Sequence, residues 1–207
     1  MTDDGVGIFA RNVPGSTEVL RAATVAVAGC GGLGSNAAVT LVRSGVGGLI
    51  LVDHDAVELS NLNRQHYFQR DVGRPKVEAL ADHLRAIHPG VRLELSRARL
   101  TPGDVPRLFS TADLLIEAFD RAEAKRWLIE AWCRAFPERW VVCASGLSGL
   151  GRTEALGVRR AGRIVLCGDQ RSDMSEGLCA ARVAIVANME ANAAVELLVG
   201  AGLAKGA

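Results

Sequence analysis

The sequence predicts an α/β protein with a doubly wound, mostly parallel sheet and an antiparallel C-terminal extension. Short apolar runs typical of buried strands alternate with amphipathic segments typical of helices along its 207 residues. A glycine-rich turn, GCGGLG at 29–34, follows the first of these runs directly. Two later apolar runs each end in an aspartate, Asp53 and Asp120. In an open parallel sheet the carboxyl ends of the strands share one edge, where ligands bind.

The first quarter of the chain predicts a β-α-β unit. A short helix is expected at 16–22, after a weakly patterned start. The apolar runs TVAVA, 24–28, and GLILVD, 48–53, predict two buried strands. Between them, apolar residues at helical spacing predict a helix at 34–44, which Gly45 ends. We expect the two strands to be parallel and their crossover to be right-handed.

A long irregular segment, HDAVELSNLNRQHYFQRDVG at 54–73, follows the second strand. A loop of this length inside a compact domain is usually functional. A helix is predicted at 75–88, where Pro75 suits the first turn and apolar residues share one face. Residues 91–96 then predict a third strand.

Two more strands and two helices complete the predicted parallel sheet. A short helix is expected at 105–110, and DLLIEAFD, 113–120, predicts a fourth strand. Residues 122–136 predict an amphipathic helix that Pro137 ends, and WVVCASG, 140–146, predicts a fifth strand.

The C-terminal part predicts an extension of different character. The segments 151–160 and 163–169 alternate apolar and polar residues and contain turn glycines, so we expect antiparallel strands. An Ala-rich segment at 180–199 predicts the last helix. Without a linker or repeat, the sequence is expected to form a single domain over 1–207.

Composition argues against several classes of protein. The net charge of +1 shows no basic excess, so no nucleic-acid partner is expected. The N-terminus lacks the features of a signal peptide, and no stretch approaches the ~20 apolar residues of a membrane span. We therefore expect a cytoplasmic protein without membrane association. The five cysteines form no C-x-x-C pair, so no zinc is expected, and buried thiols are the default reading of each.

The glycine turn and Asp53 predict a nucleotide site. Gly29, Gly31 and Gly34 form a G-x-G-x-x-G pattern whose backbone amides can hold phosphate, although such glycines also serve tight packing. Asp53 lies 19 positions after Gly34, the spacing of an acidic residue that accepts hydrogen bonds from a ribose. Asp55 would share this role or cap the loop. This pair of signals fits NAD and ATP equally.

Charged residues downstream favour a triphosphate. Arg64 and Lys76 could both reach the glycine turn, and two cations suit more negative charge than one pyrophosphate carries. Taken alone, either Arg64 or Lys76 would be interpreted as an ordinary solvated side chain. Asp120 is placed to hold Mg²⁺ beside a polyphosphate, or to cap the helix after it. An NAD-dependent oxidoreductase and a non-catalytic scaffold remain as alternatives, but neither accounts for both cations.

Four motifs together, GCGGLGS, VDHDAVELSNLNRQ, GRPK and the FD that follows an apolar strand, resemble the ThiF/MoeB/HesA family. That family shares the adenylation fold of ubiquitin-activating enzymes. The resemblance covers roughly residues 8–199 and is nearest to the short, zinc-free second type of ThiF. It implies a Rossmann-like domain that uses ATP and Mg²⁺ to adenylate the C-terminal Gly-Gly carboxylate of a ThiS-like, ubiquitin-fold sulfur carrier protein for thiamin synthesis. Related enzymes adenylate a MoaD-like carrier or a tRNA threonylcarbamoyl group.

The resemblance also implies individual roles. The residues expected to contact the nucleotide are Gly29, Gly31, Gly32, Leu33, Gly34, Asp53, Asp55, Ser60, Asn61, Asn63, Arg64, Gln65, Lys76 and Asp120. Arg64, Lys76 and Asp120 are expected to be catalytic, with Asp120 as the metal ligand. Arg11 is expected to reach the partner's ATP in a homodimer, although RNVPG departs from the family's R-x-x-R-Q. Gly32 is expected to leave room for phosphates, and Cys179 is the nearest candidate for a covalent step.

Overall fold

One seven-stranded sheet organises the part of the chain that the computed structural model describes, residues 6–205. Its strand order is β3-β2-β1-β4-β5-β7-β6. All neighbours are parallel except β6, which runs antiparallel to β7 at the sheet edge. The predicted doubly wound sheet with an antiparallel extension is thereby confirmed. The strands are β1 (Thr24–Ala28), β2 (Gly48–Val52), β3 (Arg92–Ser96), β4 (Leu114–Glu117), β5 (Trp140–Ala144), β6 (Gly157–Ala161) and β7 (Ile164–Gly168).

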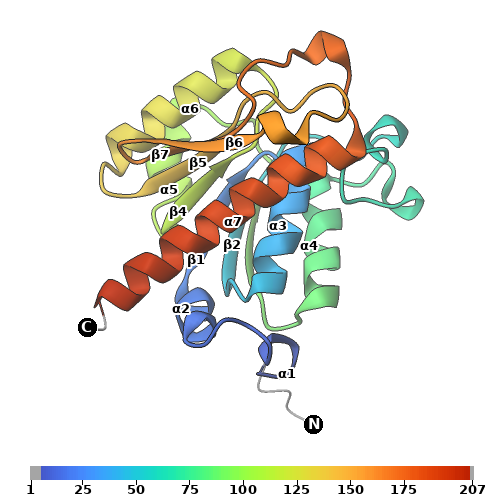
Figure 1. Ribbon diagram of the computed structural model, residues 1–207. Coiled ribbons are helices and arrows are strands. Elements are labelled where there is room, and N and C mark those ends of the chain that lie inside the picture. Colours follow the sequence, from blue (N-terminus) through green and yellow to red (C-terminus); the bar gives the residue numbers. More distant parts are fainter. Residues whose placement is uncertain (1–5, 206–207) are drawn as a thin grey trace.

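Helices cover both faces of this sheet (Figure 1). Side chains of successive strand residues alternate between the faces: Val25 and Val27 pack with α3, α4 and α7, whereas Ala26 and Ala28 pack with α5 and α6. The helices are α1 (Val6–Phe9), α2 (Ser16–Ala22), α3 (Gly32–Ser44), α4 (Lys76–Ile87), α5 (Val105–Leu108), α6 (Ala122–Ala135) and α7 (Ala180–Lys205).

The structure differs from the predicted elements at positions that matter for the site. Helix α1 was not predicted, and α3 begins two residues earlier than expected, at Gly32. Strand β4 ends at Glu117, which pairs with Ala28, the last residue of β1. Asp120 therefore lies on the turn after the strand and does not end it. The apolar alanine and phenylalanine before Asp120 extended the predicted strand too far.

Helix α7 extends beyond the predicted range of 180–199, to Lys205. Its Ala180–Gly202 part meets the length and composition of a membrane span, with a mean hydropathy of 1.4. Half of its most apolar stretch is buried inside the protein, where Val186, Ala187 and Ala191 pack in the core. We interpret α7 as a core helix, because its buried face packs on α3 and the sheet.

A buried carboxyl group, Glu190, faces the sheet from the middle of α7. Its side chain is fully buried, and neither carboxyl oxygen has a hydrogen-bond partner among the described residues. Desolvation raises the pKa of Glu190 well above its ordinary value; nearby Glu117 adds to this effect and Lys125 opposes it. The folded protein therefore holds a proton on Glu190 that the unfolded chain releases above about pH 4.

Between the pKa of Glu190 in the unfolded chain and its higher pKa in the folded protein, the folded state binds more protons than the unfolded state. The free energy of unfolding therefore falls as pH rises through this range. We expect Glu190→Gln, which cannot ionise, to raise the free energy of unfolding at pH 7.5 by about 1–3 kcal/mol. This increase in the free energy of unfolding should shrink towards pH 4.5. Urea denaturation of the parent protein and of Glu190→Gln at pH 7.5 and at pH 4.5 measures it. An equal difference at both values would contradict it.

Candidate functional site

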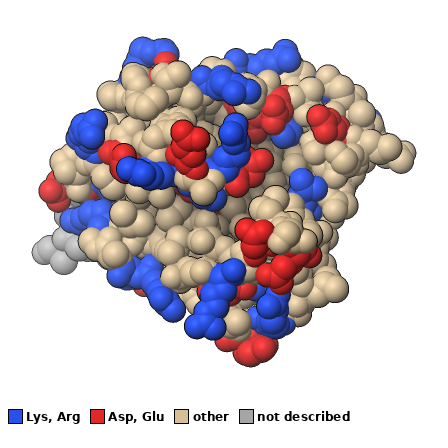
Figure 2. All heavy atoms as spheres, turned by 90° about the horizontal axis from the view of Figure 1, so that it is seen from above, with Lys and Arg blue, Asp and Glu red and all other residues tan. Residues whose placement is uncertain are grey.

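A cavity of about 640 Å³ opens at the carboxyl ends of the central strands. Figure 2 looks down on the upper end of the molecule in Figure 1, where Lys and Arg side chains are interspersed with Asp and Glu around a central hollow. The expected nucleotide residues that line the cavity are Gly29, Gly31, Gly32, Leu33, Asp53, Asp55, Arg64, Gln65, Lys76 and Asp120.

The glycine turn joins β1 to the N-terminus of α3. Gly29 has a φ of +94°, and a Cβ there would lie 2.8 Å from the carbonyl oxygen of Ala118, so a side chain is excluded. A Cβ on Gly34 would lie 1.8 Å from the Gly29 oxygen. Gly34 does not line the cavity, and its role in this structure is the close approach of helix and turn. The first turn of α3, whose amides lack partners inside the helix, lines the cavity and suits an anion.

Gly32 has a different neighbourhood from the one expected. A Cβ at this position would lie 3.0 Å from Cγ1 of Val183 on α7 and 3.6 Å from Cγ of Arg64. The glycine therefore lets the start of α7 and the Arg64 side chain approach the turn. Room for phosphates at Gly32 itself stays a prediction.

Asp53 holds the glycine turn in place. It follows β2 directly, and its Oδ2 accepts a hydrogen bond from the backbone N–H of Cys30 at 2.7 Å. Its Oδ1 accepts from the N–H of Asp55 at 2.9 Å. Each oxygen keeps a second lone pair, and the side chain lines the cavity. The structure thus adds an organising role for Asp53, and its contact with a ribose stays a prediction.

Lys76 and Asp55 form an ion pair on the cavity wall. The Nζ of Lys76, at the start of α4, lies 3.1 Å from Oδ2 of Asp55. Lys76 is buried, whereas the Asp55 side chain is half exposed and also lies 3.2 Å from Nε2 of His54. Asp53, His54 and Asp55 each offer one atom that could bind a metal ion, and these three atoms lie within 4.8 Å of one another. These acidic side chains are already engaged by backbone N–H groups and by Lys76, so we assign no metal there.

Arg64 and Gln65 reach the cavity from the turn between β2 and α4. Arg64 Nη1 donates to the Ser60 carbonyl at 3.2 Å and to Asn63 Oδ1 at 2.8 Å. Gln65 is buried beside Gly31, and its Oε1 has no partner among the described residues. A buried polar atom without a partner at a cavity wall is available to a ligand.

The remaining residues of this turn shape it rather than line the cavity. Asn61 is buried, and its Oδ1 accepts from the N–H of Glu58 at 3.1 Å. Ser60 and Asn63 are exposed, and Asn63 supports Arg64. Nucleotide contacts by Ser60, Asn61 and Asn63 stay predictions.

Asp120 lines the cavity on the turn between β4 and α6. Its side chain is exposed, and no hydrogen bond or ion pair engages its carboxylate in the described part of the chain. Mg²⁺ is commonly held by one or two protein carboxylates together with substrate phosphates. A free carboxylate in the same cavity as Lys76 and Arg64 fits that pattern, so the residues present suit Mg²⁺ at Asp120.

Arg11 lies away from this cavity. It follows α1, which packs at the end of the molecule opposite the carboxyl ends of the strands (Figure 1), and its side chain is exposed. Arg11 thus does not line its own chain's cavity. The predicted contact of Arg11 with a partner's nucleotide stays a prediction.

The motifs did not predict two features of the cavity wall. One is Lys125, which lines the cavity and forms an ion pair with the fully buried Glu117. The signal for this pair was a single charged residue inside an otherwise apolar strand. The other is an apolar wall that comes from distant parts of the chain, which no local pattern could join: Phe119, Trp127, Leu147, Met174, Leu178 and Val183.

The C-terminal part of this wall is fixed by a buried ion pair between Arg182, on the first turn of α7, and Asp169. Arg182 also donates to the carbonyls of Gly151 and Arg152. Asp169 in turn accepts from the N–H groups of Arg171 and Ser172, both at 2.8 Å. These contacts join the β5–β6 loop, the β7–α7 loop and the start of α7 beside the cavity.

None of the five cysteines lines the described nucleotide cavity, where a thiol for a covalent step was expected. Cys30 is buried as predicted, and desolvation raises its pKa well above the ordinary value. Burial likewise raises the pKa of Cys143 and of Cys167 to about 12. Cys179 is partly buried just before α7, and neither described cavity includes it. Its covalent role stays a prediction.

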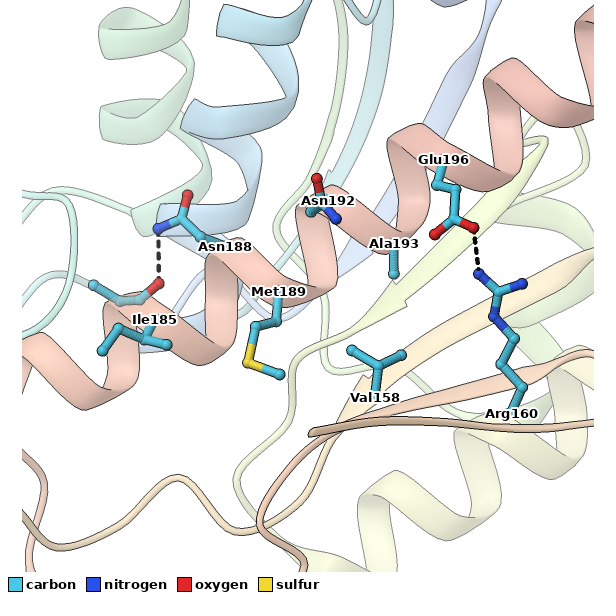
Figure 3. A pocket seen from close by; sticks show the side chains of 9 residues that line it. Val158, Arg160, Ile185, Asn188, Met189, Asn192, Ala193 and Glu196 are labelled. Carbon is cyan, nitrogen blue, oxygen red and sulfur yellow. Dashed lines mark hydrogen bonds and ion pairs between the residues drawn. The ribbon is translucent and has the colours of Figure 1, made fainter. Parts of the chain in front are cut away.

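A second cavity, of about 730 Å³, lies between α7 and the edge strand β6. Figure 3 shows Met189 and Ala193 of α7 on the side that faces Val158 of β6, beside the ion pair of Arg160 with Glu196 at 2.8 Å. None of the predicted nucleotide residues lines this groove.

The fold and the first cavity are those of a nucleotide-binding α/β domain, and comparison with known proteins defines the family. The chain belongs to the ThiF family, whose family-wide pattern matches residues 8–206. The resemblance predicted from the sequence motifs is confirmed.

Individual relatives agree with this assignment. The adenylyltransferase and sulfurtransferase uba4 of Aspergillus niger is 42% identical over 110 residues, which span 53% of this chain and 23% of that protein. The ubiquitin-like modifier-activating enzyme 5 of Caenorhabditis briggsae is 38% identical over 119 residues, 52% of this chain and 28% of that protein. The matches thus cover only about a quarter of these longer relatives.

A solved structure matches nearly the whole chain. The tRNA N6-threonylcarbamoyladenosine dehydratase TcdA of E. coli, in complex with ATP, superposes with a TM-score of 0.79 at 25% identity. The match covers 97% of this chain and 93% of that one. This similarity supports the fold over nearly its full length.

Proposed function

We propose that this protein is an ATP-dependent adenylyltransferase that activates the C-terminal carboxylate of a ThiS-like, ubiquitin-fold sulfur carrier protein. The observation that carries the proposal is the single cavity in which a glycine turn and a helix N-terminus meet Lys76, Arg64 and the free carboxylate of Asp120. Positive charge together with a carboxylate that can hold Mg²⁺ suits the binding of a triphosphate. An NAD-dependent oxidoreductase would not need these two cations and this carboxylate together. Membership of the ThiF family also argues against an oxidoreductase.

The proposed reaction joins two anions. A carboxylate oxygen of the acceptor attacks the α-phosphorus of ATP, the bond from that phosphorus to the bridging oxygen breaks, and pyrophosphate leaves. The product is an acyl-adenylate. No side chain need remove a proton, because the carboxylate is already ionised near neutral pH. The protein's work is therefore to position the reactants and to compensate their charge.

Named residues would share that work. The first turn of α3 and the cations Lys76 and Arg64 would contact phosphate oxygens, and Asp53 would face the ribose. Asp120 would hold Mg²⁺, which when bound offsets charge on the phosphates. The expected homodimer, with Arg11 supplied to the partner's site, belongs to this proposal.

Three similar proteins guide the choice of acceptor. The names of uba4 and of the modifier-activating enzyme 5 describe proteins that act with sulfur or ubiquitin-like modifiers, which favours a small carrier protein. TcdA, by its name, acts on a tRNA nucleoside and matches this chain over almost its whole length, which favours a threonylcarbamoyl carboxylate on tRNA. Acidic and basic side chains are interspersed on the face around the hollow (Figure 2), and the net charge is +1, so neither this face nor the overall charge favours tRNA.

The acceptor is identified by pyrophosphate exchange. Purified protein with ATP, Mg²⁺ and labelled pyrophosphate is offered a ThiS-like carrier, a MoaD-like carrier or threonylcarbamoyl-modified tRNA. We expect labelled ATP only with the ThiS-like carrier, and not with the same carrier lacking its final glycine. Exchange with the tRNA alone would overturn the carrier proposal in favour of the second acceptor.

A further inference from the structure

Glu117 and Lys125 form an ion pair at the edge of the cavity. The Nζ of Lys125 lies 3.0 Å from Oε2 of Glu117. The Glu117 side chain is fully buried, and only 19% of the Lys125 side chain is exposed. Desolvation raises the pKa of Glu117, and the charge of Lys125 opposes this rise. A buried pair of this kind is often no more stabilising than apolar residues of the same volume, so stability alone does not account for it.

The pair spans the turn that carries Asp120. Glu117 is the last residue of β4, and Lys125 lies near the start of α6. The second carboxylate oxygen of Glu117, Oε1, accepts a hydrogen bond from the N–H of Phe119 at 2.7 Å. Glu117 therefore holds the chain on both sides of Asp120, one residue before it and five residues after it.

The same turn is tied to the glycine turn across the sheet. The N–H of Ala118 donates to the carbonyl of Ala28 at 2.9 Å. A Cβ on Gly29 would lie only 2.8 Å from the carbonyl oxygen of Ala118. The two turns are in direct contact, so a shift of the turn after β4 changes the distance between Asp120 and the glycine turn.

Asp120 depends on this backbone support. Its own carboxylate is exposed and has no partner in the described residues, so only its backbone fixes its place. Mg²⁺ demands near-ideal octahedral geometry at about 2.1 Å, and a small displacement of one ligand weakens binding. Residues that hold a metal ligand in place commonly change metal affinity by about 10–100-fold when they are substituted.

We propose that the Glu117–Lys125 pair positions Asp120 for the divalent cation that accompanies a bound nucleoside triphosphate. This inference rests on the proposed function, and both residues are positioning residues. Glu190, the other buried carboxyl group near Lys125, makes no hydrogen bond to the turn, so we do not include it among the residues that position Asp120.

Calorimetric titration with ATP, in the presence and absence of Mg²⁺, tests the inference without any acceptor. In Glu117→Gln and Lys125→Met, we expect metal-free ATP affinity within twofold of the parent. The strengthening of ATP binding by Mg²⁺ should fall about tenfold. The double variant should be no worse than the poorer single variant, because the two residues act as one unit. Lys125→Arg, which keeps the charge, should recover most of the Mg²⁺ effect.

Two variants serve as controls. Glu190→Gln removes a buried carboxyl from the same cluster, and Arg126→Met removes an exposed cation that pairs with Glu130 on α6. Both should leave the Mg²⁺ effect unchanged.

An unchanged Mg²⁺ effect in Glu117→Gln and Lys125→Met, with lowered thermal stability, would show a purely structural pair and overturn the inference. If Glu117→Gln does not fold, Lys125→Met and Lys125→Arg carry the same test, since Lys125 is partly exposed. Failure of pyrophosphate exchange with every acceptor would reject the proposed function. The calorimetric test of the Glu117–Lys125 pair would still stand, because it uses only ATP and Mg²⁺.

Discussion

Asp120→Ala is expected to lower the rate of acceptor-dependent pyrophosphate exchange by at least about 100-fold. The variant loses the carboxylate that faces the cavity without a partner among the described residues, and with it the proposed ligand of Mg²⁺. The free energy of unfolding should change by less than about 0.5 kcal/mol, because the side chain is exposed. Metal-free ATP should bind at least as well as before, since a negative charge beside the phosphates is gone.

Glu123→Ala provides the matched comparison for Asp120→Ala. Glu123 is an exposed carboxylate that lines the same cavity from the first turn of α6. Its removal should leave the exchange rate within threefold of the parent. An undiminished rate in Asp120→Ala, or an equal loss in both variants, would show that Asp120 is not the specific metal ligand.

Lys76→Met is expected to lower the exchange rate by about 100-fold and to weaken ATP binding. Methionine retains most of the buried apolar stem, so the loss concerns the ammonium group, which lies 3.1 Å from Asp55. Without it, the carboxylate of Asp55 faces the cavity without compensation and repels the phosphates. Steady-state exchange over a range of ATP concentrations, together with calorimetry, measures both effects.

The double variant Lys76→Met/Asp55→Asn separates two possible actions of Lys76. If Lys76 contacts the phosphates, the double variant stays slow although the charge of Asp55 is gone. Recovery of the parent rate would show that Lys76 only neutralises Asp55, and its assignment as a phosphate ligand would be wrong.

The fold could be predicted because its signals are local. Short apolar runs and glycines at element ends depend on neighbouring residues, so the order of strands and helices followed from the sequence. The glycine turn and Asp53 could be placed at one edge for the same reason, because parallel strands end together. The prediction missed helix α1 and the first residues of α3, and it overran the end of β4, where Ala118 and Phe119 continue the apolar pattern although the ladder stops at Glu117.

The parts of the site that escaped prediction depend on contacts distant in sequence. Met174 and Val183 reach the cavity only because the loops before α7 fold back, held by Arg182 and Asp169. Gly34 and Gly32 belong to the same motif, yet one serves the packing of helix on turn and the other the approach of α7. The G-x-G-x-x-G spacing marks Gly34, whereas Gly32 falls at one of its free positions, and the spacing alone reveals neither role.

Pyrophosphate exchange tests the central claim, adenylation of a carboxylate by this cavity, most directly. The protein, ATP and Mg²⁺ are mixed with labelled pyrophosphate and each of the three acceptors in turn. Cleavage at the α-phosphorus predicts that label enters ATP only when an acceptor with a free carboxylate is present, and that removal of Mg²⁺ stops it. Absence of label in ATP with all three acceptors, or release of inorganic phosphate in place of pyrophosphate, would contradict the account.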